Sequence, residues 1–472
     1  MKVHDLAIVG TGIGGSLISA LNKHKDLIIF EKDRNLGGCA STFKKSGYYF
    51  NTGATTFVGY EDNHPVKRVF DKVGFIPDIQ KSDVAIRVIQ GDKQIDRVKD
   101  FDSFLEQINM VYPHKNNYIF WKTIKDIDEQ FWLLKKVYYA KYSLSSIIKT
   151  TSSLFELIRV YKLDLLKSAD SFIKSILPNI TLEYKRFIDS QLLITLQTNS
   201  ENIPLISLAL GLSYPFHDVF YANGGMGKIF DDLLFDFNIN KKEIIRKIHR
   251  DKDIYRLVTN KDEYLFKNVV LNSTIYDSKN LFDDKKIIDY YSKFSFYDQS
   301  AFVIYLKLDS KESFLNHYQI ILDKAIPNCI SNSFFISFSK IDDKKLSNNG
   351  YSITISSHTK ALFWENLSKE DYKIKKELTQ NFIISKFLEY FKSLKKEDII
   401  YKTSGSSKTF KRYINRNNCG GQAIFMKDLL KIPSCKTPFK GLYNIGDTVF
   451  AGQGWPGIAI GVEVLNSELN NG

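Results

Sequence analysis

A glycine-rich turn near the start of the chain, GTGIGG from Gly10 to Gly15, constrains the fold more than any other feature. It follows an apolar run, Leu6 to Val9, and opens an amphipathic stretch that precedes a second apolar run, Leu27 to Phe30. Short apolar runs predict buried strands, and the amphipathic stretch between them predicts a helix. We therefore expect a unit of strand, glycine turn, helix and strand at the start of the chain.

The turn and the residue after the second run fit a dinucleotide site in a Rossmann-type fold. Gly10 permits a tight turn, Gly12 lets the backbone approach a pyrophosphate, and Gly15 allows close packing of the helix on the strand. Glu31 can accept hydrogen bonds from both ribose hydroxyls, which disfavours a 2′-phosphate. Nicotinamide and flavin dinucleotides share this pattern. The predicted cofactor site also includes two neighbours, Gly14 and Lys32.

The composition is that of an ordinary globular protein, with 43% hydrophobic and 25% charged residues. A length of 472 residues suggests two to four structural units, and we expect two lobes. The net charge of +13 comes from 66 Lys and Arg against 53 Asp and Glu, but only 11 of the basic residues are Arg. Because base and phosphate recognition favours the planar Arg side chain, we expect no nucleic-acid partner.

The cysteines and the first residues favour a cytoplasmic protein. The cysteines are too few and too scattered for a disulfide framework: Cys39, Cys329, Cys419 and Cys435. The opening MKVHDLAIVG lacks the organisation of a signal peptide, and no window of about 18 uninterrupted apolar residues could span a bilayer. We expect a chain in a reducing compartment that is either soluble or peripherally associated with a membrane.

The middle of the chain changes its pattern three times. Phe101 to Tyr214 reads as helical, including the run FWLLKKVYYAKY, and Lys241 to Tyr276 predicts a small antiparallel meander. Residues 295–410 mix strands with one helix near Asp371 to Leu394. We predict an α/β fold with a Rossmann-type domain assembled from three separated segments, 1–75, 216–280 and 411–472. A second, mixed α+β lobe for the substrate comes from two insertions, 76–215 and 281–410.

Two segments after Glu31 indicate which dinucleotide is bound. KDRNLGGCASTF contains the pair Gly37 and Gly38, and GYYFNTGATTF contains Asn51 and Gly53. They resemble the amine oxidase and phytoene desaturase superfamily, in which the glycine pair wraps the pyrophosphate and flavin side of bound FAD. Asn51 stands where that family most often has Asp. The resemblance also adds Cys39, Ser41 and Thr42 to the cofactor site.

The end of the chain carries the closest resemblance. GLYNIGDTVFAGQGWPGIAIGVEVLNSEL is very similar to the ending of carotenoid desaturases, carotenoid isomerases and retinol saturases, and it implies FAD with Gly446 and Asp447 at the ribityl position. A helix with Pro456 at its first position would direct its positive end at the flavin pyrimidine. YANGGMGKIFDDL, NVVLN and TFKRYINRNNCGGQ resemble further family segments in the expected order. The remaining predicted cofactor positions are Ile245, Asn272, Gly454, Gly457 and Ile458.

The sequence does not single out a catalytic side chain. A flavin that accepts a hydride needs a nearby substrate carbon and a water-poor cavity, and it does not strictly need a side-chain base. The candidates are Gln453 and Trp455, for which simple packing is the alternative, and His217, which precedes the YANGGMG turn. The eight histidines show no metal-binding spacing, so we predict no metal site.

The helical insertion allows two interpretations. Between Trp132 and Lys167, seven Lys or Arg residues against Glu156 and Asp164 are interleaved with aromatic residues. This composition suits a helix that lies in lipid headgroups, and it also suits a helix with a core-facing aromatic side and a solvated lysine side. The apolar run IPLISLALGL, ending at Leu212, is either a cavity wall or an ordinary core helix.

The resemblance implies an FAD-dependent oxidoreductase that desaturates, saturates or isomerises carbon-carbon double bonds in an apolar polyene, such as a carotenoid or retinoid, by hydride exchange with the flavin. Cys39 and the GDTVFAGQG ending favour the isomerase and saturase branch. Two alternatives remain. An amine oxidase would be reduced by an amine, and a non-catalytic binder similar to the escort proteins of prenylated GTPases would lack a flavin.

Overall fold

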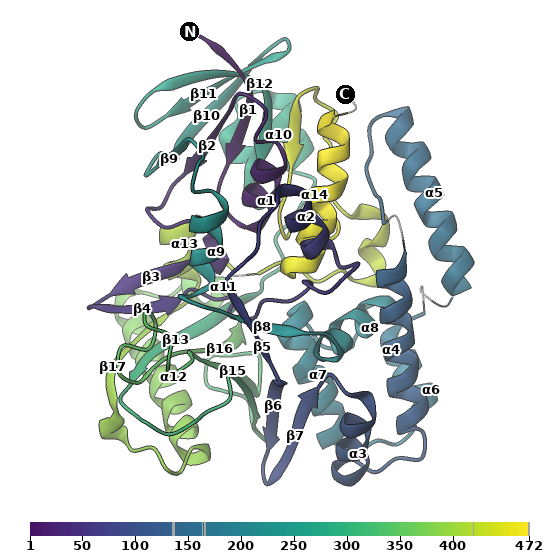
Figure 1. Cartoon of the computed structure of the whole chain (residues 1–472), viewed down its shortest axis with the longest axis vertical. Coiled ribbons are helices and arrows are strands. Elements are labelled where there is room, and N and C mark those ends of the chain that lie inside the picture. The colour runs from purple at the N-terminus through teal and green to yellow at the C-terminus, as the bar shows by residue number, and fades with distance from the viewer. Residues whose placement is uncertain (135–136, 163, 165–166, 419, 471–472) are drawn as a thin grey trace.

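A sheet of seven strands forms the upper part of the molecule in the computed structural model, which describes residues 1–134, 137–162, 164, 167–418 and 420–470 (Figure 1). The strand order is β10-β11-β12-β1-β2-β9, and β18 pairs with the second half of β12. The strands are β1 (Val3–Val9), β2 (Leu27–Glu31), β9 (Ile239–Lys241), β10 (Ile245–Asp251), β11 (Ile254–Thr259), β12 (Glu263–Leu271) and β18 (Leu442–Asn444). Both termini lie in this upper part (Figure 1).

The central strands of this sheet are parallel and buried, as their apolar runs predict. β1 pairs with β2 on one side and with β12 on the other, so that Ala7 lies opposite both Ile28 and Val269. Five helices pack around this sheet and its extensions: α1 (Ile13–Leu21), α2 (Pro65–Val73), α9 (Met226–Leu233), α10 (Lys285–Tyr291) and α14 (Gly454–Asn470). The first and last helices, α1 and α14, lie side by side (Figure 1).

A second seven-stranded sheet lies below the first and has the order β17-β13-β16-β15-β14-β6-β7. Its strands are β6 (Val84–Gln90), β7 (Lys93–Val98), β13 (Ser300–Leu308), β14 (His317–Ile321), β15 (Ser333–Phe338), β16 (Tyr351–Thr359) and β17 (Ile399–Gly405). Three helices accompany it: α11 (Ala361–Glu365), α12 (Lys369–Tyr390) and α13 (Ser407–Ile414). Two antiparallel pairs complete the described strands: the hairpin of β3 (Thr42–Lys45) and β4 (Tyr48–Asn51), and the long-range pair of β5 (Ile79–Ser82) and β8 (Val219–Ala222).

The helical insertion shares a core with strands β6, β7 and β14 of the second sheet. It contains α3 (Phe101–Val111), α4 (Asn117–Leu133), α5 (Leu144–Tyr161), α6 (Ala169–Ile176), α7 (Leu182–Leu196) and α8 (Leu205–Ser213). Ser, Thr or Asp side chains cap the N-termini of α3, α5, α6 and α7, where each accepts a backbone N–H of the first turn. Among the described residues, no helix combines the length and the apolar character needed to cross a bilayer.

The predicted fold class is confirmed: a Rossmann-type sheet built from separated segments accompanies a mixed α+β part. The predicted continuous helix through FWLLKKVYYAKY is wrong, because α4 ends at Leu133 and residues 137–141 have no regular secondary structure. Residues 135 and 136 of this run lie outside the described part. The Tyr138 hydroxyl instead donates to Glu468, and the Tyr139 hydroxyl donates to the carbonyl of Ile432 at 2.9 Å.

Candidate functional site

The glycine turn joins β1 to α1 in the way its residue types require. Gly10 has φ +99°, in the region that favours glycine, and a Cβ on Gly15 would lie 2.0 Å from the Gly10 carbonyl oxygen. Gly12 is the N-cap of α1, which has no side-chain cap and no acidic residue in its first turn. The N–H groups at this helix start therefore form a favourable site for an anion.

Glu31 ends β2 beside this turn and is almost fully buried. Its carboxylate accepts the backbone N–H groups of Thr11 and Asp33, both at 2.9 Å, and the Thr11 hydroxyl. Burial raises the pKa of the Glu31 carboxyl, and the hydrogen bonds from Asp33 and Thr11 oppose that rise. The network fixes the carboxylate at the wall of the cavity described below, where its remaining lone pairs can accept ribose hydroxyls.

The second glycine pair packs directly on the first turn. Gly37 and Gly38 both have positive φ, and a Cβ on Gly38 would lie 3.5 Å from the Cα of Gly12. The backbone N–H of Gly37 donates to the Thr11 carbonyl at 3.1 Å. Cys39 follows and lines the same cavity. The two glycine-rich loops thus approach one another with no side chain between them.

Ser41, Thr42 and Asn51 have a different setting from the predicted cofactor contacts, because none of them lines the cavity. The Thr42 hydroxyl donates to Asn51 Oδ1 at 2.8 Å and accepts the Gly227 N–H at 2.9 Å. Asn51 Oδ1 also accepts the Met226 N–H at 3.0 Å. Thr42 and Asn51 therefore hold the N-terminus of α9, which begins at Met226, against the loops.

The final segment lies against the opening turn. β18 pairs in parallel with β12 and delivers Gly446 and Asp447 to the cavity, and a Cβ on Gly14 would lie 3.2 Å from the Gly446 nitrogen. Asp447 Oδ2 lies 3.0 Å from Nη2 of Arg416, a residue to which the sequence assigned no role. Arg416 also donates to the Gly420 carbonyl at 2.6 Å, while its buried Nε has no hydrogen-bond partner among the described residues.

The helix α14 begins at Gly454, two residues before the predicted first position at Pro456, so Pro456 lies within the first turn. Proline is tolerated there because the first-turn N–H groups have no partners within the helix. Gly452 and Gly454 have positive φ, and the first turn carries no acidic residue. Residues 451–458 line the cavity, so this helix start also offers N–H groups to a ligand.

A single cavity of about 600 Å³ connects these loops with the second sheet and the helical insertion. At one end lie the glycine loops and Glu31, and at the other lie apolar side chains that include Phe131, Leu210 and Val303. Most predicted cofactor positions line it: Gly10, Gly12, Gly14, Glu31, Lys32, Gly37, Gly38, Cys39, Gly53, Ile245, Asn272, Gly446, Asp447, Gly454, Pro456, Gly457 and Ile458. Gly15 does not, in keeping with its predicted packing role. Cys419 lies outside the described residues.

The predicted flavin neighbours Gln453 and Trp455 both touch the cavity, but they differ in freedom. Gln453 Nε2 donates to the Leu196 carbonyl at 3.0 Å. Trp455 is only 2% exposed, and its ring is stacked with Phe230 at a centroid distance of 5.4 Å. Packing therefore accounts for most of the Trp455 ring.

The run IPLISLALGL forms α8 and fits both predicted interpretations, a cavity wall and a core helix. Its Leu210 lines the cavity, and its Leu208 packs in the core.

His217 lies in the cavity wall between two carboxylates. Its Nε2 is hydrogen-bonded to Asp128 of α4, and its Nδ1 lies 3.4 Å from Glu61 Oε2. Burial alone would lower the pKa of His217, but the hydrogen bonds to Asp128 and Glu61 outweigh it and raise the pKa to about 9. Burial lowers the pKa of the neighbouring His64 to about 4. We interpret His217 as a buried imidazolium that is held between the carboxylates of Asp128 and Glu61.

One ring nitrogen of each histidine and a Glu61 oxygen lie within 4.8 Å of one another, a distance compatible with a shared metal ion. The sequence spacing could not reveal this group, because Glu61 and His64 precede α2 whereas His217 precedes β8. Both nitrogens of His217 already face carboxylates, so the ion pairs account for the placement of this histidine. The buried Nδ1 of His64 has no hydrogen-bond partner among the described residues.

Comparison with known proteins places these features in context. The family model described as an NAD(P)-binding Rossmann-like domain matches residues 8–73. The prolycopene isomerase of Daucus carota is 24% identical, with 96% of this chain and 78% of that protein aligned. The all-trans-retinol 13,14-reductase of Danio rerio is 35% identical over 72 residues, which are 15% of this chain and 12% of that protein.

Solved structures share the fold at low sequence identity. An oxidoreductase from Methanosarcina mazei has a TM-score of 0.65 and 18% identity, with 98% of this chain and 100% of that chain covered. A putrescine oxidase with bound putrescine has a TM-score of 0.64 and 11% identity, with 100% and 99% covered. The resemblance to the carotenoid isomerase and retinol saturase group is confirmed, and so is the expectation of an enzyme of the oxidoreductase class.

Proposed function

We propose that the chain binds FAD in this cavity and acts on carbon-carbon double bonds of an apolar polyene. The observation that carries the proposal is the meeting of both chain ends on one cavity. The turn from Gly10 to Gly14 and the segment from Gly446 to Ile458 contribute to the same wall, 432 residues apart at their nearest in sequence. A ligand with an anionic middle and two different ends would contact both.

The residues present fit FAD at each part of that molecule. The start of α1 and the glycine loops would hold the pyrophosphate, Glu31 the adenosine ribose, and Asp447 the ribityl hydroxyls. The buried Nε of Arg416 has no hydrogen-bond partner within the described part of the chain, which supports an additional acceptor at this point, because buried donors are seldom left without one. Because the glycines of the two loops carry no side chains, their backbone could approach the pyrophosphate closely.

Bound FAD would supply a ring that accepts or donates a hydride. The residues of the chain would orient the ring, stabilise charge on it and exclude water from the substrate. N–H groups at the start of α14 would stabilise negative charge on the pyrimidine side of the ring. The apolar side chains of Phe131, Leu210 and Val303 would exclude water from the substrate and hold a long hydrocarbon against the ring.

The names of the relatives favour a polyene over an amine. The long match is to a prolycopene isomerase and the short one to a retinol reductase. The putrescine oxidase shares only the fold, at 11% identity. Because the fold is shared with an amine oxidase, oxidation of an amine is the second candidate function. An apolar substrate dissolves in lipid rather than in water, so contact with a membrane surface forms part of the proposal.

We also propose the predicted division into domains. The FAD-binding domain consists of residues 1–75, 216–280 and 411–472, and the substrate lobe consists of residues 76–215 and 281–410.

The test is anaerobic mixing of the purified holoenzyme with each substrate class. We expect a polyene to be isomerised by the pre-reduced enzyme, or to change the redox state of the flavin, as followed by absorption and chromatography. Bleaching of the oxidised flavin by a primary or secondary amine, with every polyene unchanged, would contradict the proposal. As a control, Leu210→Trp fills the apolar end of the cavity, and it should abolish polyene turnover while leaving flavin content unchanged.

A further inference from the structure

The helix α5 buries polar side chains and exposes apolar ones. The only residues of Leu144–Tyr161 that are buried are Ser146, Ser153 and Tyr161. The outward face carries six large apolar side chains that are 40% to 75% exposed: Leu144, Ile147, Ile148, Leu154, Phe155 and Ile158. Their spacing of three, four and seven residues places them on one stripe of the helix. A helix of a globular protein normally buries such a stripe.

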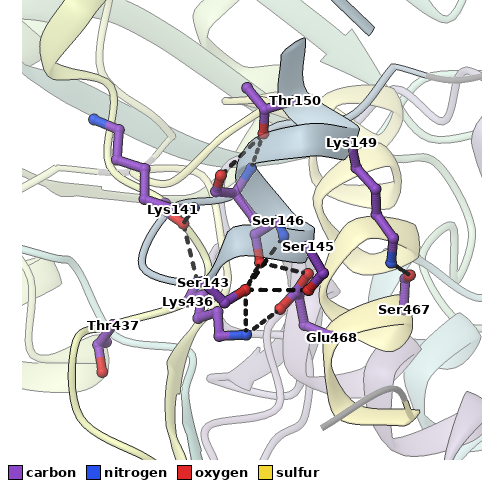
Figure 2. A network of polar contacts seen from close by, with 12 residues as sticks. Lys141, Ser143, Ser145, Ser146, Lys149, Thr150, Lys436, Thr437, Ser467 and Glu468 are labelled. Carbon is purple, nitrogen blue, oxygen red and sulfur yellow. Dashed lines mark hydrogen bonds and ion pairs between the residues drawn. The ribbon is translucent and has the colours of Figure 1, made fainter. Parts of the chain in front are cut away.

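Polar contacts hold the serine side of α5 against α14 (Figure 2). Glu468 of α14 accepts the Ser146 hydroxyl at 3.0 Å and the Lys436 ammonium at 2.6 Å. Lys149 donates to the Ser467 hydroxyl at 3.2 Å. The contacts of Ser146 and Lys149 fix the rotation of the helix, because a turn that buried the apolar stripe would break both of them. The outward direction of the stripe is therefore built into the fold.

A further exposed apolar residue lies near the segment that precedes α5. Leu430 is 91% exposed, and its carbonyl accepts the Lys141 ammonium at 3.4 Å just before α5 begins. Figure 1 shows α5 along the outer edge of the molecule, with its outward side free of other described elements. A contiguous apolar surface of this kind marks a place where a partner or a membrane binds.

The charges around the stripe select an anionic lipid surface. Residues 141–162 contain four cations, Lys141, Lys149, Arg159 and Lys162, against the single acid Glu156. Cations beside an apolar helix face suit anionic headgroups, with the apolar face at the acyl boundary. A second copy of the chain fits less well, since a two-fold contact would bring the same cations against each other.

The inner end of α5 lies close to the cavity. Tyr161 and Leu157 pack in one cluster with Phe131 and Ile460, and the latter two line the cavity. One layer of side chains therefore separates the helix from the apolar end of the proposed substrate site. A lipid-dissolved substrate would have a short path from the bilayer to the cavity.

We propose that α5, together with Leu430, docks the enzyme on an anionic bilayer with the helix parallel to the membrane plane and its apolar stripe inserted. The docking proposal is argued only from the exposed residues of this surface. The suggestion that docking helps to load an apolar substrate rests on the proposed function. Vesicle binding needs neither flavin reduction nor substrate, so a failure of docking and a failure of the proposed chemistry are distinguishable.

The test is flotation of the full-length holoenzyme with vesicles of phosphatidylcholine and phosphatidylglycerol, compared with phosphatidylcholine alone. We expect binding to the anionic vesicles, and we expect Ile148→Ser with Phe155→Ser to weaken it at least about tenfold. The matched control is Ile374→Ser with Leu378→Ser, which removes two exposed apolar side chains that lie one turn apart on α12. This control should bind like wild type.

A second measurement covers the case in which the double variant folds poorly. In Phe155→Trp, the emission should shift to the blue with anionic vesicles and be quenched by brominated acyl chains, beyond the response of the native tryptophans. Three results would overturn the proposal: no flotation of wild type, equal loss in the α12 control, or a vesicle-free dimer that dissociates on the α5 substitutions. The last result would assign the stripe to a second copy of the chain.

Discussion

Arg416 and Asp447 form an ion pair in the cavity wall, and their side chains are 15% and 13% exposed. Asp447 was expected from its motif, whereas Arg416 was only part of a longer resembling segment. Its partner depends on how the chain after α13 folds back to the end of β18, which no local pattern encodes. Removing one member of an enclosed pair leaves the other charge buried without compensation.

Arg416→Gln should lower the retention of FAD at least about tenfold, because it removes both the partner of Asp447 and a cation near the expected pyrophosphate. The measurement is FAD affinity by fluorescence titration of the flavin-stripped protein. Arg412→Gln is the matched control, since Arg412 lies four residues earlier on the exposed side of α13. Equal affinities in the two variants would show that Arg416 is not part of the cofactor site.

His217 predicts a specific dependence of stability on pH. Its folded-state pKa is raised from 6.5 to about 9, so its contribution is complete below pH 6.5 and is lost as the pH rises through about 9. A shift of this size corresponds to about 3 kcal/mol. The measurement is the free energy of unfolding in urea for wild type and His217→Gln across this range. The difference between them should shrink as the pH rises, whereas the exposed His24→Gln should show no such trend.

At the scale of elements, α9 illustrates how a departure from the family pattern is accommodated. Its first N–H groups have no partners within the helix, and α9 has no side-chain cap of its own. Asn51 and Thr42, from strands β4 and β3, accept them instead. A neutral amide performs this task through its oxygen, so the negative charge usual in the family is not needed for it.

Asn51→Leu should therefore lower the free energy of unfolding by about 1–3 kcal/mol, because the Met226 N–H and the Thr42 hydroxyl both lose their acceptor. Asn51→Asp keeps an acceptor oxygen in place and should cost less than half as much. Chemical denaturation of the three proteins checks this order. Equal destabilisation by Asn51→Leu and Asn51→Asp would mean that the hydrogen bonds accepted by Asn51 do not contribute to stability.

At the scale of the whole molecule, the sequence patterns predicted the first sheet well because glycine turns and buried parallel strands have strong local signals. The meander appears as β10 to β12, and the helix near residue 371 appears as α12. The strands β5 to β7 and β14 went unpredicted. Long-range pairing accounts for part of this, because β5 pairs with β8 and β14 pairs with β6, although β6 also pairs with its neighbour β7. The ion pair of Arg416 and the carboxylates around His217 likewise depend on tertiary folding.

The site was predictable to the extent that single segments carry it. Gly10, Glu31 and Asp447 belong to such segments, and the fold brings them to one cavity. Thr42 and Asn51 show the limit of motif reasoning, because they belong to the same motifs yet support the N-terminus of α9 and do not line the cavity. A motif does not distinguish a residue that lines the cavity from one that holds the lining in place.

The most direct test is the flavin content of the purified full-length chain, compared with Glu31→Ala and Asp447→Ala. We predict about one FAD per wild-type chain, identified by its absorption bands and by mass after release, and clearly reduced retention in each variant while both remain folded. A chain that holds no FAD even after reconstitution, or variants that retain it as firmly as wild type, would contradict the claim that the two ends of the chain grip one flavin.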